Sequence, residues 1–174
     1  SQERLEDCIN SDLANNFGNL CQRVTAFAEK NCHSKIPADI DFKSEDLKIL
    51  DKFKDNLELI RKKIDELDLN FYINFIVNTL FETNKYFNDQ EPWKKKDDIK
   101  RLNTIVYTTL EIVRKLSFML YPIIPQSSLN ALKIFSIKES EIDYSSLENH
   151  NFLTAGNMIH KIEILFKKIE KNHD

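Results

Sequence analysis

The sequence contains only two glycines and four prolines among its 174 residues. Because glycine and proline form most tight turns and end many helices, this scarcity favours long helices joined by few turns. The chain also has no GxGxxG or GxxxxGK[ST] motif, and two glycines cannot supply a loop that cradles phosphates. The sequence therefore predicts a helical protein without a nucleotide-binding loop.

Long apolar runs and paired cysteines are missing as well. No segment approaches the roughly 20 apolar residues that span a bilayer, and no signal-peptide pattern opens the chain. The three cysteines, Cys8, Cys21 and Cys32, are odd in number and form no CxxC pair, so we expect reduced thiols and a cytoplasmic location. The chain lacks an initiator methionine and begins inside a helical pattern, from which we expect a fragment of a longer protein.

The net charge and the histidines limit the function further. A formal net charge of -3 argues against a protein that clamps many phosphates non-specifically, but it leaves open the recognition of a few bases. The four histidines, His33, His150, His160 and His173, lie far apart, and none has a partner at metal-ligand spacing. We therefore expect neither a catalytic residue nor a metal site in this chain.

Apolar residues recur every three or four positions along most of the chain, which is the helical period. The predicted helices cover about residues 2–31, 44–64, 68–90, 97–120 and 127–135, with Ser44 and Ser127 or Ser128 near two of the N-caps. The remainder is less regular and is predicted to hold a short strand or turn and a last helical turn or two. The fold class is all-α: an antiparallel bundle of about five helices over 1–150, with a C-terminal tail over 151–174.

A polar stripe interrupts the apolar pattern of the first helix. In "DLANNFGNLCQR", Asp12, Asn16, Asn19 and Arg23 fall at i, i+4, i+7 and i+11, along one face of a helix. Asn19 and Arg23 lie one turn apart and can reach the same object. Amide and guanidinium groups form paired hydrogen bonds with base edges. The alternative is that the stripe faces another helix or solvent.

The only tryptophan stands in a very polar stretch, "YFNDQEPWKKKDD". Trp93 follows a proline and has five cations near it in the sequence: Lys94, Lys95, Lys96, Lys100 and Arg101. An aromatic ring among cations is typical of a surface that stacks an unpaired base and contacts phosphate. The alternative is a ring folded over the end of the bundle with its lysines in solvent.

These stretches resemble the C-terminal anticodon-binding domain of bacterial methionyl-tRNA synthetase, a class I aminoacyl-tRNA synthetase. The resemblance covers nearly the whole chain and rests on "DLANNFGNLCQR", "TNKYFNDQEPW", "LYPIIPQSS" and the weaker "GNMIHKIEILFKKIE". Its most specific element is Asn-x-Tyr-x-x-x-x-x-Pro-Trp, here Asn84 to Trp93.

The resemblance implies a tRNA-binding domain of a methionine-tRNA ligase that reads the CAU anticodon of tRNA-Met. It implies that Trp93 stacks on an anticodon base while Asn19 and Arg23 read base edges. The implied partners are tRNA-Met and the protein's own N-terminal catalytic domain, with no DNA and no membrane. ATP with magnesium, and methionine, would belong to that catalytic domain, where the ligase reaction takes place.

Two departures from the family accompany the resemblance. The HIGH and KMSKS signatures and the zinc knuckle are absent, so we expect no aminoacylation by this chain alone. The family's tail pattern, KPEPLF, has two prolines, but Lys161 to Phe166 have none. We expect the tail to pack back on the bundle or on the catalytic domain. The alternative function is a helical protein-interaction or scaffold domain with no RNA role.

Overall fold

The computed structural model describes residues 2–162, with side chains from residue 10 onwards. The α-helices are α1 (Gln2–Asn31), α2 (Ser44–Asp55), α3 (Leu57–Asp65), α4 (Leu69–Gln90), α5 (Ile99–Leu120) and α6 (Pro125–Leu132). Short 3-10 helices follow as η1 (Pro92–Lys94), η2 (Lys133–Phe135), η3 (Glu139–Glu141) and η4 (Tyr144–Glu148). Over 2–162 there is no strand, only an isolated bridge between Lys35 and Met158, so the predicted all-α bundle is confirmed.

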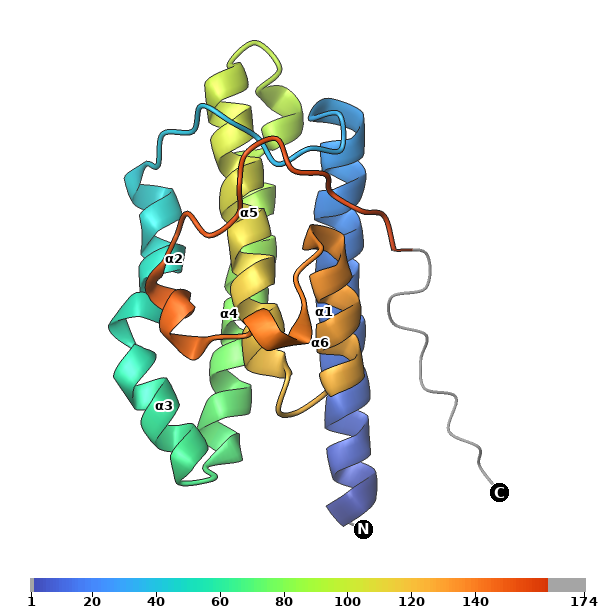
Figure 1. The fold of residues 1–174 in the computed structure, drawn as a ribbon, viewed down its shortest axis with the longest axis vertical. Helices are drawn as coiled ribbons and strands as arrows, with labels where there is room; N and C mark the ends of the chain where they lie inside the picture. Colours follow the sequence, from blue (N-terminus) through green and yellow to red (C-terminus); the bar gives the residue numbers. More distant parts are fainter. Residues whose placement is uncertain (1, 163–174) are drawn as a thin grey trace.

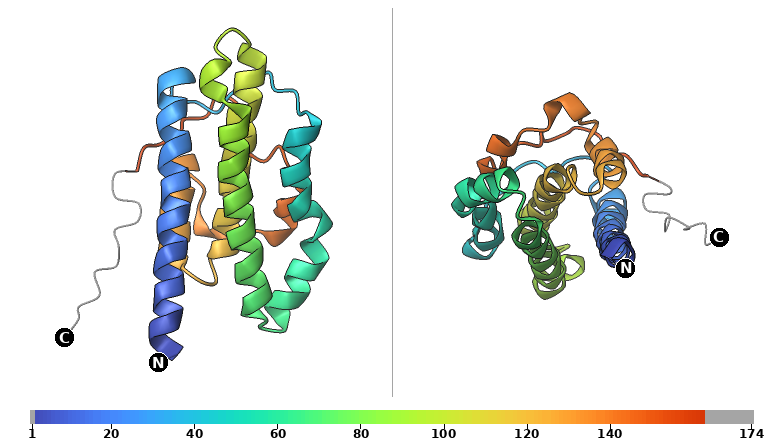
Figure 2. Two further views of the ribbon diagram at one scale, coloured as in Figure 1. Left: turned by 180° about the vertical axis from the view of Figure 1, so that it is seen from behind. Right: turned by 90° about the horizontal axis from the view of Figure 1, so that it is seen from below.

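The helix α5 lies at the centre of the bundle, and every residue over 104–120 is buried. Figure 1 shows α1, α2, α4 and α6 arranged around it. Helices α1 and α4 run in the same direction and lie side by side, while α5 returns in the opposite direction (Figure 2). The connection that holds η1 is at the end of the bundle where α1 and α4 finish.

The apolar positions of the helical pattern form one core. Phe17 of α1, Phe53 of α2 and Phe118 of α5 are fully buried within it. Burial of such a side chain contributes about 1.5–3 kcal/mol relative to leaving it in water. The same periodicity that predicts the helices therefore also explains how they pack.

The predicted helix over residues 44–64 is interrupted at Asn56. This residue is the C-cap of α2, and its Nδ2 donates to the Lys52 carbonyl at 2.8 Å. An asparagine competes for backbone hydrogen bonds in this way, which ends a helix although the apolar pattern continues on both sides. The apolar period alone therefore predicted one helix where the structure has two.

Two predicted N-caps are also different. The N-cap of α2 is Lys43, one residue before Ser44, and the Lys43 N–H donates to Asp46 Oδ2 at 2.8 Å. Helix α6 begins at Pro125, not at the serines, because a proline at the first helical position needs no N–H partner. Ser128 instead donates its hydroxyl to the Ser117 carbonyl of α5 at 2.6 Å, and so joins two helices.

Residues 151–162 cross the bundle as an irregular segment with a turn at 154–157, and backbone hydrogen bonds hold it. The Ile36 N–H donates to the Asn157 carbonyl at 2.8 Å, and the Ile159 N–H to the Ser34 carbonyl at 2.7 Å. The Tyr107 hydroxyl of α5 donates to the Leu153 carbonyl at 2.7 Å. The predicted last helical turns, and most of the tail from Lys161 to Phe166, lie outside the described residues.

A buried charged network joins α5 to the segment over 144–153. Glu111, Arg114 and Lys115 are all fully buried. Glu111 accepts from Arg114 Nη2 at 2.8 Å and from the Leu153 N–H at 2.9 Å. Lys115 Nζ donates to the carbonyls of Leu147 and Asn149 at 2.6 and 2.9 Å. Because buried charges need such partners, these hydrogen bonds hold the irregular segment against α5.

Two further observations concern the described part of the chain. No helix there is long and apolar enough to cross a membrane. Cys21 and Cys32, whose side chains are described, are free thiols, and burial raises the pKa of the Cys32 thiol to about 11.

Candidate nucleic-acid interface

Trp93 is presented at one end of the bundle by the turn between α4 and α5. Helix α4 ends at Gln90, Glu91 has a left-handed backbone with φ +48°, and the buried Pro92 begins η1. The indole remains 41% exposed, although its ring lies 6.1 Å from that of the buried Phe87. Proline fixes the backbone at this point, so the ring rests on the bundle on one side and is open on the other.

Arg23 of α1 reaches this corner. Its guanidinium carbon lies 4.8 Å from the centroid of the Phe87 ring and 5.9 Å from that of Trp93. The Arg23 Nη2 also donates to Asn88 Oδ1 of α4. A cation over aromatic faces and one hydrogen bond hold the side chain in place. Arg23 is half-buried, whereas the polar stripe predicted a side chain in solvent.

Asn19 lies one turn before Arg23 and is exposed, as are Asn16 and Asp12 of the same stripe. Among the residues that the structure describes, Asn19 has no side-chain hydrogen bond to another residue. The structure therefore places Arg23 beside Trp93 and leaves the Asn19 amide open on the neighbouring turn of α1. The stripe therefore faces solvent at Asp12, Asn16 and Asn19 and contacts another helix, α4, at Arg23.

The cations near Trp93 are fewer than the sequence indicated, because three of the five have carboxylate partners. Arg101 turns away and forms a bidentate pair with the buried Asp46 at 2.8 and 3.0 Å. Lys94 pairs with Glu91 at 2.7 Å, and Lys100 lies 3.8 Å from Asp39. The hydrogen bond from Lys94 and its positive charge lower the pKa of the Glu91 carboxyl. Lys95 and Lys96 remain, so the corner suits stacking and hydrogen bonding better than clamping of many phosphates.

The sequence did not single out the two residues that hold Arg23. It placed Phe87 only on the apolar face of its helix, and it gave Asn88 no role. Both lie in "TNKYFNDQEPW", directly before Trp93. A helical wheel shows which residues of one helix share a face, but it does not show which residue of another helix they meet. That pairing required the structure.

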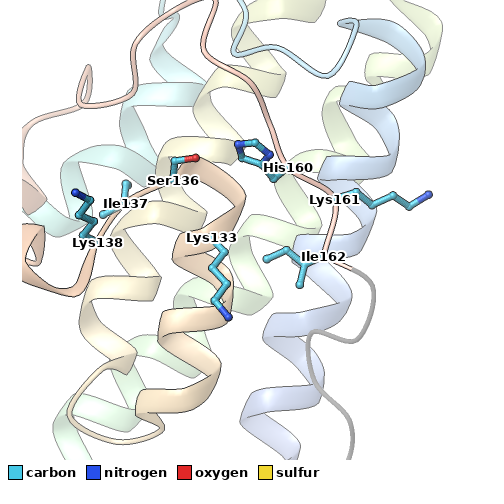
Figure 3. Close-up of a pocket in the computed structure, with 7 residues that line it drawn as sticks. All are labelled: Lys133, Ser136, Ile137, Lys138, His160, Lys161 and Ile162. Carbon is cyan, nitrogen blue, oxygen red and sulfur yellow. The ribbon is translucent and has the colours of Figure 1, made fainter.

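A second basic surface lies on the other side of α1. A shallow pocket of about 540 Å³ is lined by Lys133, Ser136, Ile137, Lys138, His160, Lys161 and Ile162. Figure 3 shows the three lysine side chains pointing in different directions. Lys161 also pairs with Glu29 of α1 at 3.5 Å. Because these cations do not converge on one point, the pocket is a weaker site for a ligand than the Trp93 corner.

The Trp93 corner offers chemistry that suits an unpaired base. The open side of the indole can stack on a base, because every base has a π-face. The Arg23 guanidinium has five N–H donors, and one of them is used by Asn88. Asn19 adds an amide that both donates and accepts. No group of three or more His, Cys, Asp or Glu within the described residues is placed to hold a metal ion, and none is at this corner.

Comparison with known sequences identifies relatives of this chain. The family described as the anticodon binding domain of methionyl tRNA ligase matches residues 36–174. The methionine-tRNA ligase of Brucella suis biovar 1 is 36% identical over 148 residues, which cover 84% of this chain and 29% of that protein. The enzyme of Thermotoga maritima is 33% identical over 172 residues, covering 98% of this chain and 27% of that protein. The chain thus spans less than a third of these relatives' length.

Solved structures give the same relationship. The apo form of methionyl-tRNA synthetase from Mycobacterium tuberculosis matches with a TM-score of 0.83 and 28% identity, covering 97% of this chain and 34% of that one. The same enzyme in complex with methionyl-adenylate matches with a TM-score of 0.81 over 91% of this chain. In sequence and in fold, the chain belongs to the family of anticodon-binding domains of methionyl-tRNA ligases.

Proposed function

We propose that this chain reads the CAU anticodon of tRNA-Met for a methionine-tRNA ligase of which it forms a part. The observation that carries the proposal is the corner where Arg23 lies within 5.9 Å of the centroid of the exposed Trp93 ring, with Asn19 open one turn away. Family membership supports it, and nothing in the structure favours the scaffold alternative over it.

In this proposal Trp93, Arg23 and Asn19 each have a different role. Trp93 stacks on one unpaired anticodon base with its open side. Arg23 donates to base-edge acceptors with the N–H groups that Asn88 does not use, and Asn19 both donates and accepts. Phe87 and Asn88 hold the Arg23 guanidinium in position before the RNA arrives, which lowers the entropy lost on binding.

The rest of the reaction belongs to the remainder of the ligase. Methionine, ATP and magnesium would bind to a catalytic domain, which would join methionine to the tRNA whose anticodon this chain holds. The described residues 144–162, which lie across the bundle, are candidates for contact with that domain. We propose that the tail over 151–174 packs back on the bundle, against which its described part 151–162 lies, or on the catalytic domain.

The test uses the full-length ligase and two tRNA-Met transcripts, one with CAU and one with a single anticodon base changed. We expect the intact enzyme to aminoacylate the CAU transcript with the higher kcat/KM. Trp93→Ala should lower kcat/KM for the CAU transcript by about 5- to 100-fold, which is the usual effect of losing the stacking of one base. Trp93→Phe keeps a ring and should lose less.

A matched control is Leu67→Ala, because Leu67 is exposed at the opposite end of α4. This variant should keep the kcat/KM of the intact enzyme for both transcripts. The proposal is wrong if the intact enzyme does not distinguish the two transcripts, or if Trp93→Ala keeps the kcat/KM of the intact enzyme for the CAU transcript.

A further inference from the structure

A second exposed aromatic side chain lies on the same face as the Trp93 corner. Phe81 of α4 is 70% exposed, and Val77, one turn before it, is 44% exposed. Single exposed apolar residues are common and need no special reason. The position of Phe81 relative to the polar stripe of α1 is what gives it significance.

The two helices carry matching stripes. On α1 the stripe is Asp12, Asn16, Asn19 and Arg23, and on α4 the same spacing gives Val77, Phe81, Asn84 and Asn88. Helices α1 and α4 run side by side in the same direction (Figure 2), and the hydrogen bond from Arg23 to Asn88 sets their register. Residues 65 positions apart therefore lie at the same level, which brings Phe81 level with Asn16 and Asn84 level with Asn19.

The side chains along this double stripe are suited to bases. Asn16 and Asn19 are exposed on α1, and both have amides that can donate and accept. The half-buried Asn84 uses its Nδ2 to donate to the Leu80 carbonyl at 3.2 Å, and its Oδ1 is an acceptor that takes no part in this bond. An aromatic ring beside hydrogen-bonding amides repeats the chemistry of the Trp93 corner further along the two stripes.

The surroundings of Phe81 favour RNA over a protein partner. The core of a protein interface is a contiguous apolar patch. On this face Val77 and Phe81 are separated from the third large exposed apolar side chain, Trp93, by two turns of α4 that carry Asn84 and Asn88. The face is continuous with the Arg23–Trp93 corner through Asn88. Phe81 lies seven residues before Asn88, or about 10 Å along the helix, which is within reach of a neighbouring nucleotide.

We propose that Phe81 is a second stacking platform, which holds an unpaired anticodon-loop nucleotide next to the one on Trp93, with Asn16 beside it. The inference rests on the proposed function and deepens it, because it extends the RNA site from one base to at least two. Its ligand is the π-face of a nucleobase, so binding at Phe81 tolerates any base.

The experiment measures the Kd of the full-length ligase for the CAU transcript as a function of salt. Phe81→Ala should weaken binding by about 5- to 100-fold, the range for loss of one stacked base. Because no phosphate contact is removed, the slope of log K against log salt should stay the same. Phe81→Tyr should restore binding, and Leu67→Ala should bind as the intact enzyme does.

A second measurement identifies the nucleotide. Transcripts with 2-aminopurine at single anticodon-loop positions should show one position whose fluorescence is quenched by the intact enzyme and not by Phe81→Ala. That position should differ from the one lost in Trp93→Ala. The inference is overturned if Phe81→Ala binds normally while Trp93→Ala is weakened, and the proposed function then still stands.

Two other outcomes have different meanings. If neither variant weakens binding, the proposed function is wrong and the inference falls with it. If Phe81→Ala binds tRNA normally but slows methionine activation in the absence of tRNA, Phe81 contacts the protein and not RNA, which also overturns the inference.

Discussion

Two arginines of this molecule lie against pairs of aromatic rings, and their surroundings differ sharply. Arg114 is fully buried, with its guanidinium carbon 4.4 Å from the centroid of Phe152 and 5.2 Å from that of Phe118. Arg23 lies 4.8 Å from the centroid of Phe87 and 5.9 Å from that of Trp93, but it is only half-buried. An arginine beside two aromatic rings therefore occurs once in the interior of the molecule and once at its surface.

The hydrogen bonds separate the two arginines further. Arg114 donates to the carbonyl and hydroxyl of Ser146, to Glu111 and to the Asn149 carbonyl, at 2.7–3.1 Å. Arg23 donates to one amide, that of Asn88. A buried cation needs nearly all its donors satisfied, whereas a surface cation can keep donors for a ligand. The comparison teaches that the donors of Arg114 are used inside the fold, whereas Arg23 keeps donors that, in the proposed function, bind the anticodon.

The largest effect should come from Arg114→Met. The change leaves Glu111 buried without its cation, and loss of one partner of a buried ion pair costs about 3–5 kcal/mol. Urea unfolding of the 174-residue chain, followed by circular dichroism, measures this loss as a lower midpoint. A change below about 1 kcal/mol would contradict a structural role and would make the two arginines alike.

A smaller loss should follow Arg101→Ala, which tests a buried pair close to the proposed RNA site. Asp46 is fully buried and would keep the Tyr86 hydroxyl and the Lys43 N–H as donors after Arg101 is removed. Loss of hydrogen bonds to a charged group costs about 1.5–3 kcal/mol. The same urea titration measures it, with Lys96→Ala as the exposed control. If tRNA affinity falls and stability does not, Arg101 belongs to the RNA site.

The buried network should also make stability depend on pH. Burial, together with the charge of Arg114, lowers the pKa of Lys115 to about 7, although Glu111, Asp51 and Glu148 oppose the shift. An unfolded lysine titrates near 10.4, so between about pH 7 and 10 the unfolded chain binds more protons than the folded one. Stability should therefore rise with pH in this window, by up to about 1.4 kcal/mol per unit.

Unfolding free energies at about pH 7 and 9, in the intact chain and in Lys115→Met, measure this dependence. The variant should lose the rise. The Trp93 corner offers a contrast, since variants there should keep the slope of the intact chain. A flat profile in the intact chain, or an unchanged slope in Lys115→Met, would show that the buried network does not control the pH response.

Much of this molecule is predictable from its sequence, for physical reasons that also set the limit. The 3.6-residue period predicts α1 to its ends, and the start predicted near residue 97 lies within two residues of Ile99, where α5 begins. The break at Asn56 was missed because Leu57 and Ile60 continue the apolar period across it. Local patterns report which face of a helix is apolar, but they do not report a single competing hydrogen bond.

The charged network could not be predicted from the sequence, because its partners come from a segment that has no helical period. Glu111, Arg114 and Lys115 lie on α5, where the sequence gives no sign that residues 144–153 cover them. For Trp93 the local sequence left two alternatives, an exposed ring and a ring folded over the bundle, and the structure has features of both: the indole is 41% exposed and lies 6.1 Å from the Phe87 ring. The partner of Arg23 was not predictable, because the contact with Asn88 joins two helices.

The measurement that tests the central comparison most directly is the pair of effects of Arg23→Ala. In the full-length ligase, kcat/KM for the CAU transcript should fall about tenfold or more, which corresponds to about 1.4 kcal/mol of lost binding. In the 174-residue chain, the free energy of unfolding should change by less than about 1 kcal/mol, because Arg23 is half-exposed. An unchanged kcat/KM together with a large loss of stability would contradict the account, since Arg23 would then support the fold as Arg114 does.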